Sequence, residues 1–180
     1  GLKDELVFIH VGRFHPAKNH EFLLNLFAEI HKRNENTKLI LVGDGQLRSE
    51  IEQQIQSLQL YSAVVLVGNR SDVPNLLQAA DCFLFPSKWE GLPVTVVEAQ
   101  ASGLPTIISN TITTQVVLSE LVHTLPIDCG TMPWVNQIME IYLKRIDVTE
   151  AIREHGFDVC TTADELKKFY LSISEKRKPT

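Results

Sequence analysis

The sequence has 180 residues, of which 44% are hydrophobic and 22% charged, the length and composition of one globular domain. Its formal net charge is −5 and no basic run is longer than Lys176–Lys178, so nothing indicates a nucleic-acid-binding surface, although a local basic pocket stays open. No apolar run approaches the ~18 residues of a membrane span, and three scattered cysteines without a C-x-x-C pair disfavour a zinc ribbon or a disulfide scaffold.

Short apolar runs alternate with longer amphipathic runs along most of the chain. Strands are expected at Leu6–Gly12, Lys38–Gly43, Ala63–Gly68, Cys82–Pro86 and Pro105–Ser109, with a weaker sixth at His123–Pro126. Helices are expected at Asn19–Asn34, Gln46–Leu60, Ser71–Ala80, Pro93–Gly103, Met132–Ile146 and Ala163–Lys176. Ser71 or Asp72 suits an N-cap, while Pro93 suits the first turn of its helix and Gly103 the end.

This alternation predicts a parallel sheet wrapped by helices, since parallel strands need crossover connections. The strands are apolar throughout, as burial on both faces requires. We therefore predict an α/β fold, a Rossmann-like doubly wound parallel sheet of about six strands, with residues 1–180 as one domain. Ligands bind such sheets beyond the carboxyl ends of the strands. The loops of interest are Gly12–Lys18, Gly43–Gln46, Gly68–Asp72 and Pro86–Pro93.

The first two of these loops contain partial motifs. After Gly12, which permits close backbone approach, Arg13 and Lys18 place two cations that suit a diphosphate, although a solvated loop would also explain them. The second loop opens like G-x-G-x-x-G, but Arg48 occupies the third glycine position. Dinucleotide binding there is therefore disfavoured against a tight turn.

Metal and hydrolase motifs are incomplete. His20 and Glu21 begin an H-E-x-x-H pattern that fails at Leu24, and the five-residue spacing of the histidines does not hold one helical face. No G-x-S-x-G elbow occurs. We expect neither a metal site nor nucleophilic hydrolase chemistry.

The stretch from Pro86 to Pro105 contains two glutamates around an expected helix start. If the helix begins at Pro93, the free amides of its first turn form an anion site, and Gly91 leaves room for a ligand. Glu90 lies just outside that site, and Glu98 lies within an apolar run one to two turns inside the helix. Phosphate on the amides and hydroxyl groups on the carboxylates would describe a sugar nucleotide.

Glu90 and Glu98 are separated by seven residues, the Glu-x7-Glu pattern of retaining glycosyltransferases. Together with the loop at Gly12–Lys18 and the strand order, the sequence resembles the carboxyl-terminal domain of glycosyltransferase family 4, over roughly residues 6–170. It most resembles enzymes of capsular and exopolysaccharide synthesis. The resemblance implies one half of a GT-B fold, in which two Rossmann-like domains face each other across a cleft and the carboxyl-terminal one binds the nucleotide-sugar donor.

The resemblance also implies roles for individual residues. The diphosphate would be held by Arg13 and Lys18, the donor sugar by Glu90 and the ribose hydroxyls by Glu98. These roles make Arg13, Lys18 and Glu90 the candidate catalytic residues. The candidate substrate-binding residues are Gly12, Asn69, Arg70, Gly91, Leu92, Pro93, Val94, Thr95 and Glu98. Asn69 and Arg70 would lie at the nucleobase, while Gly91 departs from the larger residue that many members have.

The sequence thus predicts the donor-binding domain of a retaining glycosyltransferase that uses a nucleoside-diphosphate sugar, with UDP favoured, in bacterial surface polysaccharide synthesis. No metal or other cofactor is expected, because Arg13, Lys18 and the helix N-terminus can stabilise the leaving group. An epimerase of similar architecture and a non-catalytic nucleotide-binding module are the alternatives.

Because the sequence starts at Gly1, directly before the first strand, we read it as a piece of a longer enzyme whose amino-terminal domain receives a glycan or lipid-linked acceptor. By itself it should be inactive. The last helix, in the family's manner, would reach towards that domain and leave Leu166, Phe169 and Tyr170 incompletely covered. A cytoplasmic location is expected, with peripheral association at the inner face of the membrane left open for the full-length protein.

Overall fold

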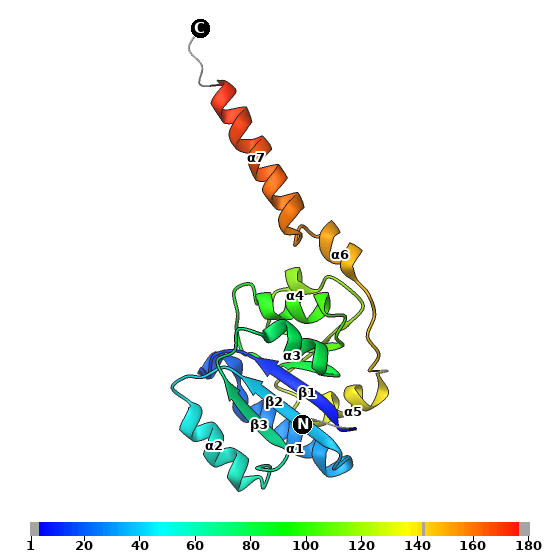
Figure 1. Ribbon diagram of the computed structural model, residues 1–180. Coiled ribbons are helices and arrows are strands. Elements are labelled where there is room, and N and C mark those ends of the chain that lie inside the picture. Colours follow the sequence, from blue (N-terminus) through cyan, green and yellow to red (C-terminus); the bar gives the residue numbers. More distant parts are fainter. Residues whose placement is uncertain (1–3, 142, 177–180) are drawn as a thin grey trace.

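The computed structural model describes residues 4–141 and 143–176. Its sheet has six strands, all paired in parallel in the order β3-β2-β1-β4-β5-β6 (Figure 1). The strands are β1 (Leu6–Val11), β2 (Thr37–Val42), β3 (Val64–Gly68), β4 (Cys82–Phe85), β5 (Thr106–Ser109) and β6 (Val122–Leu125). Each lies where the apolar runs predicted it, so the Rossmann-like α/β fold is confirmed. The order reverses between β1 and β4, which makes a topological switch point at that position.

Helices cover both faces of this sheet. They are α1 (His20–Arg33), α2 (Arg48–Ser57), α3 (Val73–Ala79), α4 (Val94–Ala101), α5 (Met132–Glu140), α6 (Thr149–Glu154) and α7 (Val159–Lys176). The short 3-10 turns η1 (Pro16–Lys18) and η2 (Thr114–Val116), like α6, were not expected from the sequence.

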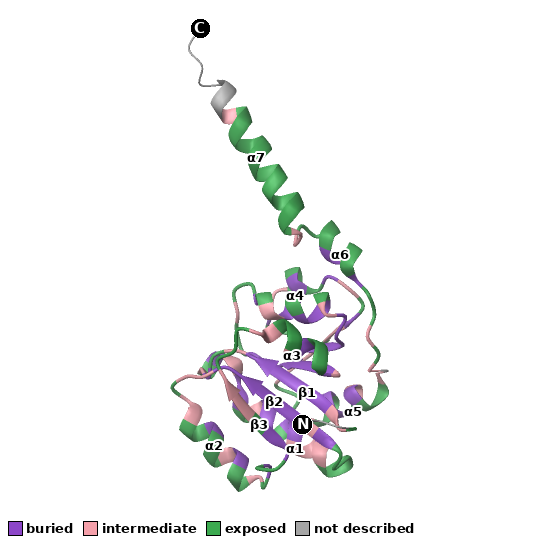
Figure 2. Cartoon of the chain, in the orientation of Figure 1, coloured by how far each residue is buried: buried purple, intermediate pink, exposed green. Residues whose placement is uncertain are grey.

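Neighbouring side chains of β1 point to opposite faces of the sheet, as the pleat requires. Val7 and Ile9 pack in the cluster that includes α3 and α4, whereas Phe8 packs in the cluster that includes α1, α2 and α5. Figure 2 shows the resulting buried sheet between exposed outer helix faces. This two-sided burial explains why the strands are apolar throughout.

One expected helix start needs correction, and another is confirmed in position. Pro93 precedes α4 as its cap residue, with φ −75° and ψ 93°, and is not part of the first turn. Asp72 is the N-cap residue of α3, as expected, although its side chain makes no capping hydrogen bond. Its carboxylate instead accepts two hydrogen bonds of 2.7 Å from Arg70.

The helix expected at Met132–Ile146 ends early, because the chain turns extended at Ile141. Ile141 and Leu143 then reach the cluster under α1 and α2. Further on, the Arg145 guanidinium donates to carbonyl oxygens at the ends of α3 and α4, those of Leu77, Gln78, Ala80 and Ser102. One arginine thus satisfies orphan carbonyls of two helices, which holds the connecting segment against the domain.

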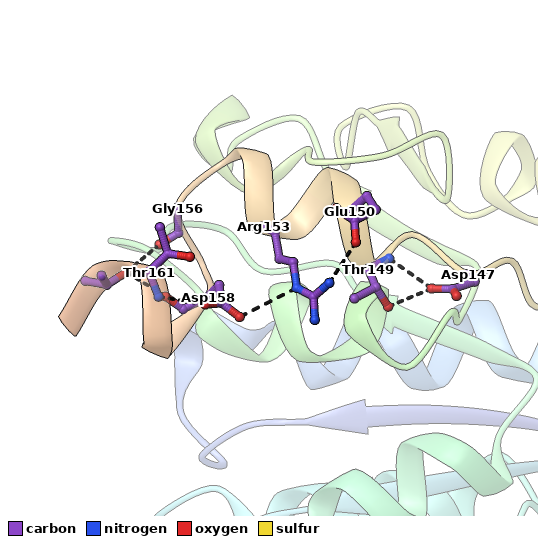
Figure 3. Close-up of polar contacts among 8 residues, drawn as sticks. Asp147, Thr149, Glu150, Arg153, Gly156, Asp158 and Thr161 are labelled. Carbon is purple, nitrogen blue, oxygen red and sulfur yellow. Dashed lines mark hydrogen bonds and ion pairs between the residues drawn. The ribbon is translucent and has the colours of Figure 1, made fainter. Parts of the chain in front are cut away.

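The last helix, α7, extends away from the sheet (Figure 1). Figure 3 shows its junction with α6, where Arg153 lies between Glu150 at 2.7 Å and Asp158 at 3.7 Å. Asp158 also accepts a 2.8 Å hydrogen bond from the amide of Thr161, which caps the start of α7. The expectation of an incompletely covered helix is confirmed for its described side chains: the exposed fractions are 52% for Leu166, 58% for Phe169 and 63% for Tyr170.

None of the helices that the structure describes combines the length and the apolar character needed to cross a bilayer.

Candidate functional site

The loops after β1, β2 and β3 are joined by backbone hydrogen bonds at the carboxyl edge of the sheet. The amide of Gly12 donates to Val42 (2.9 Å), and the amide of Gly43 donates to Gly68 (2.8 Å). Gly43 has a φ of +134°, and a Cβ there would lie only 2.1 Å from the Gly12 oxygen. This crossing of two backbones therefore needs a glycine.

A cavity of about 650 Å³ opens above these loops. Four residues that the sequence predicted line it, namely Gly12, Arg13, Asn69 and Arg70. Arg13 is exposed, and its side chain makes no hydrogen bond or ion pair within the described part of the chain. A guanidinium with all its donors available therefore faces a cavity of the size that small-molecule ligands occupy.

Asp44 and Gly45 also line this cavity; they lie in the Gly43–Gln46 loop that was expected at this edge, although neither was assigned a role in binding. The Asp44 carboxylate accepts a 2.8 Å hydrogen bond from the Gly45 amide and lies 3.2 Å from Arg48. The Gly-Asp-Gly run after β2 was read only as a tight turn. Its position at the carboxyl end of a strand predicted the loop at this edge, but no motif singled out Asp44 within it.

Arg70 is the second arginine of the cavity, and it differs from Arg13 in being paired. Its Nε and Nη2 atoms each lie 2.7 Å from an oxygen of Asp72. Hydrogen bonding to Arg70 lowers the pKa of the Asp72 carboxyl below its usual value. The pair is partly exposed and orients the guanidinium at the rim of the cavity.

Lys18 and Glu90 form an ion pair beside the cavity, with Nζ and Oε1 2.7 Å apart and the side chains 16% and 15% exposed. The pair joins the loop after β1 to the loop after β4, so it spans the topological switch point. Asn19 makes this geometry possible. It adopts a left-handed conformation (φ 56°) directly after Lys18, and its side-chain amide donates to the Pro86 oxygen at 3.1 Å.

A buried aromatic and histidine cluster lies next to this ion pair. Lys18 Nζ is 4.4 Å from the centre of the Phe85 ring, and the His10 ring stacks on Phe85 at 5.5 Å. The centres of the His10 and His20 rings are 5.0 Å apart. Burial lowers the pKa of His10 well below its usual value and that of His20 to about 4, so both are neutral near pH 7. The sequence considered these histidines only as metal ligands.

The start of α4 presents its first turn at the surface. Leu92 and Val94 are exposed, Thr95 is half-buried, and the Val96 amide donates to Pro93 at 3.0 Å. The first amides of a helix have no partner inside it. A Cβ on Gly91 would meet nothing within 4 Å, so the approach to this end is open.

Glu98 does not lie in the core, although its neighbours are apolar. It is exposed, on the same face of α4 as Val94 and Ala101. The buried polar residue of this helix is Gln100, whose amide donates to Val96 and Val116 and accepts from Leu118. The sequence did not single out Gln100. Its position two residues after Glu98 puts it on the opposite side of the helix.

Within residues 4–141 and 143–176, no group of three or more His, Cys, Asp and Glu side chains is arranged to hold a metal ion.

The fold and the site together define a Rossmann-like α/β domain whose polar loops gather at the carboxyl edge of the sheet, around its switch point. The chain belongs to the group 1 glycosyl transferases, whose family model matches residues 1–154.

Individual relatives agree with this family. EpsF of Bacillus subtilis (strain 168), named as a glycosyltransferase, is 38% identical over 178 residues, which cover 96% of this chain and 46% of that protein. CapH of Staphylococcus aureus, a capsular polysaccharide biosynthesis glycosyltransferase, is 27% identical over 176 residues, or 94% of this chain and 49% of that one. The chain thus spans about half the length of the curated relatives it matches.

A solved structure shows the same fold. The Anabaena protein Alr3699/HepE, crystallised with UDP and glucose, matches with a TM-score of 0.77 at 23% identity. The match covers 94% of this chain and 49% of that one. The chain therefore has the architecture of one half of a GT-B fold.

Proposed function

We propose that this chain is the donor-binding domain of a retaining glycosyltransferase that takes a sugar from a nucleoside diphosphate, favouring UDP, and passes it to a glycan or lipid-linked acceptor of a surface polysaccharide. One observation carries this proposal. An open cavity lined by Arg13, whose side chain has no partner among the described residues, adjoins the Lys18–Glu90 pair across the switch point. The UDP in the crystallised Anabaena relative and the capsular role of CapH support the choice of donor and process.

In this proposal the cavity above β1, β2 and β3 takes the nucleoside, and Asn69 and Arg70 contact its nucleobase. Arg13 and Lys18 bind the diphosphate with the amides near Leu92–Thr95. Glu98, exposed on α4, accepts hydrogen bonds from the ribose. Glu90 contacts the sugar through Oε2, the carboxylate oxygen that is not paired with Lys18.

The reaction would cleave the bond between the anomeric carbon and the diphosphate. The negative charge that develops on the leaving oxygen needs preorganised donors, and two cations and a helix N-terminus supply them without a metal or other cofactor. The front-face displacement often proposed for the family needs no protein nucleophile. We therefore assign no nucleophilic role to any residue of this chain.

Sugar transfer by this chain alone is not expected. An acceptor has to be held in line with the sugar, and such positioning accounts for several kcal/mol of barrier. We assign that surface to the half of the relatives that this chain does not match.

Calorimetry with UDP and uridine tests the proposal. We expect UDP to bind more tightly than uridine, with an advantage that falls as salt is added. At 100 times its dissociation constant, UDP should stabilise the fold by about 2.7 kcal/mol, measured as a shift in Tm. Absence of UDP binding by the folded chain would exclude a donor site here. Binding followed by sugar transfer from a labelled donor, without any further domain, would contradict the division of roles.

A further inference from the structure

Nε2 of His10 is a buried polar atom beside the site. The His10 side chain is fully buried on β1, and its Nδ1 lies 2.8 Å from the carbonyl oxygen of Leu84. A carbonyl oxygen only accepts, so the hydrogen of the neutral ring belongs on Nδ1 and Nε2 is left as an acceptor. Within the described residues Nε2 has no hydrogen-bond partner. A buried acceptor without a partner is costly, which points to a donor that reaches it.

Lys18 is the cation next to that acceptor. A Cβ placed on Gly12 would lie 2.8 Å from Lys18 Cε and 3.2 Å from His10 Nε2, so both groups border the space that a side chain at position 12 would fill. Phe85 lies against both groups, beneath the ammonium and stacked on the imidazole. Burial and the charge of Lys18 both act to lower the pKa of His10, which keeps the ring neutral.

An ammonium has three N–H donors, and the contact with Glu90 Oε1 uses one of them. We propose that His10 is a positioning residue for Lys18, whose ammonium donates to Nε2 as well as to Glu90, with and without a bound ligand. The two acceptors then fix the third N–H towards the edge where the diphosphate lies. This inference rests on the proposed function for the role of Lys18. The flexible four-carbon stem of a lysine lets its ammonium adjust towards this acceptor.

Three substitutions separate this role from packing. His10→Asn can keep a donor near the Nδ1 position, and so the bond to Leu84, but it has no atom at the Nε2 position. His10→Gln places an amide oxygen near that position. His10→Phe keeps the stacking on Phe83 and Phe85 without any acceptor.

The expected result is selective. His10→Asn and His10→Phe should lower the affinity for UDP about tenfold and leave that for uridine unchanged, because a hydrogen bond to a charged group has that effect. His10→Gln should recover part of the loss. In a Lys18→Met background, His10→Asn should cost nothing further. Equal UDP affinity in folded parent and variants, or equal losses for UDP and uridine, would overturn the positioning role.

A second measurement needs no nucleotide. In protein labelled with 15N-histidine, the Nε2 resonance of His10 should move in Lys18→Met and stay in place in Lys38→Met, a lysine on β2 that bonds to the Ser62 oxygen. An unmoved resonance in Lys18→Met would overturn the inference whatever UDP does. A shifted resonance in a protein that does not bind UDP would instead leave the contact standing and overturn the proposed function.

Discussion

The cavity above β1–β3 and the cluster behind Lys18 lie at one edge of the same sheet, yet they are built differently. The cavity has a floor of glycine backbone and exposed charges such as Arg13. The cluster is buried, with an ion pair, an aromatic ring and two neutral histidines in contact. Backbone conformation therefore shapes the cavity, whereas side-chain packing and charge balance hold the cluster. Substitutions should affect the two regions in different ways.

The largest effect is expected at the backbone crossing under the cavity. Gly43→Ala puts a Cβ 2.1 Å from the Gly12 oxygen at a φ of +134°, so one of the two loops has to move. We expect a loss of roughly 3–5 kcal/mol in the free energy of unfolding, measured by urea denaturation. Gly91→Ala is the matched control, since its Cβ meets nothing. Similar stability of the two variants would show that the crossing does not constrain the fold.

The second effect belongs to the cluster and depends on pH. His20 has a pKa of about 4 in the folded chain, mainly because of burial and then because of Lys18, against an ordinary value near 6.5. The stability that the neutral His20 ring contributes is complete above pH ~6.5 and is lost as the pH falls towards 4. In that range the imidazole is protonated in the unfolded chain but still neutral in the folded one, which favours unfolding. The loss amounts to about 3 kcal/mol.

His20→Phe should remove this part of the acid sensitivity. A phenyl ring can keep the contacts with His10 and Phe14, and no described hydrogen bond is lost with the two ring nitrogens. The free energy of unfolding, measured by urea denaturation at several pH values, should therefore fall less between pH 7 and pH 4 for the variant than for the parent. His155→Phe, at an exposed position, is the control. An equal loss of unfolding free energy in the parent and in His20→Phe would contradict the lowered pKa of the buried His20.

The sequence predicted the cavity better than the cluster, for a physical reason. Parallel strands place their carboxyl ends at one edge, so Gly12, Arg13, Asn69 and Arg70 were expected to meet once the strands were assigned, and they line one cavity. The Lys18–Glu90 contact depends instead on the left-handed conformation of Asn19, which the sequence pattern did not predict. The resemblance assigned roles to both residues without implying that they pair.

Helix boundaries and helix faces show the same limit. The strands were found because long apolar runs specify burial directly. The end of α5 was not predicted correctly, because it depends on where Ile141 and Leu143 reach the core and on how Arg145 holds the chain that follows. The exposure of Glu98 needs the correct helical register, since an apolar run alone cannot show which side of α4 faces water.

The third prediction compares the two cations directly. Arg13→Ala and Lys18→Met should each weaken UDP binding about ten- to a hundredfold and change uridine binding little, because charged hydrogen bonds to the diphosphate are lost. Only Lys18→Met should also alter stability, since it leaves Glu90 partly buried without its cation. Calorimetry gives the affinities and urea denaturation the stabilities. UDP affinity equal to that of the parent in either variant would remove that residue from the site.

The smallest effect is expected at Glu98, the residue of the pair that faces solvent. Glu98→Gln keeps the shape of the side chain, and an exposed position contributes little to packing, so Tm should stay within about 1 °C of the parent. The weakened ribose contact should lower the affinities for uridine and UDP by the same factor, about fivefold, because both ligands contain the ribose. Calorimetry on both ligands measures this factor, with Glu120→Gln as the control, since Glu120 is an exposed glutamate just before β6. A loss confined to UDP would assign Glu98 to the phosphates. A large fall in Tm with unchanged affinities would make it a structural residue, contrary to its exposed position on α4.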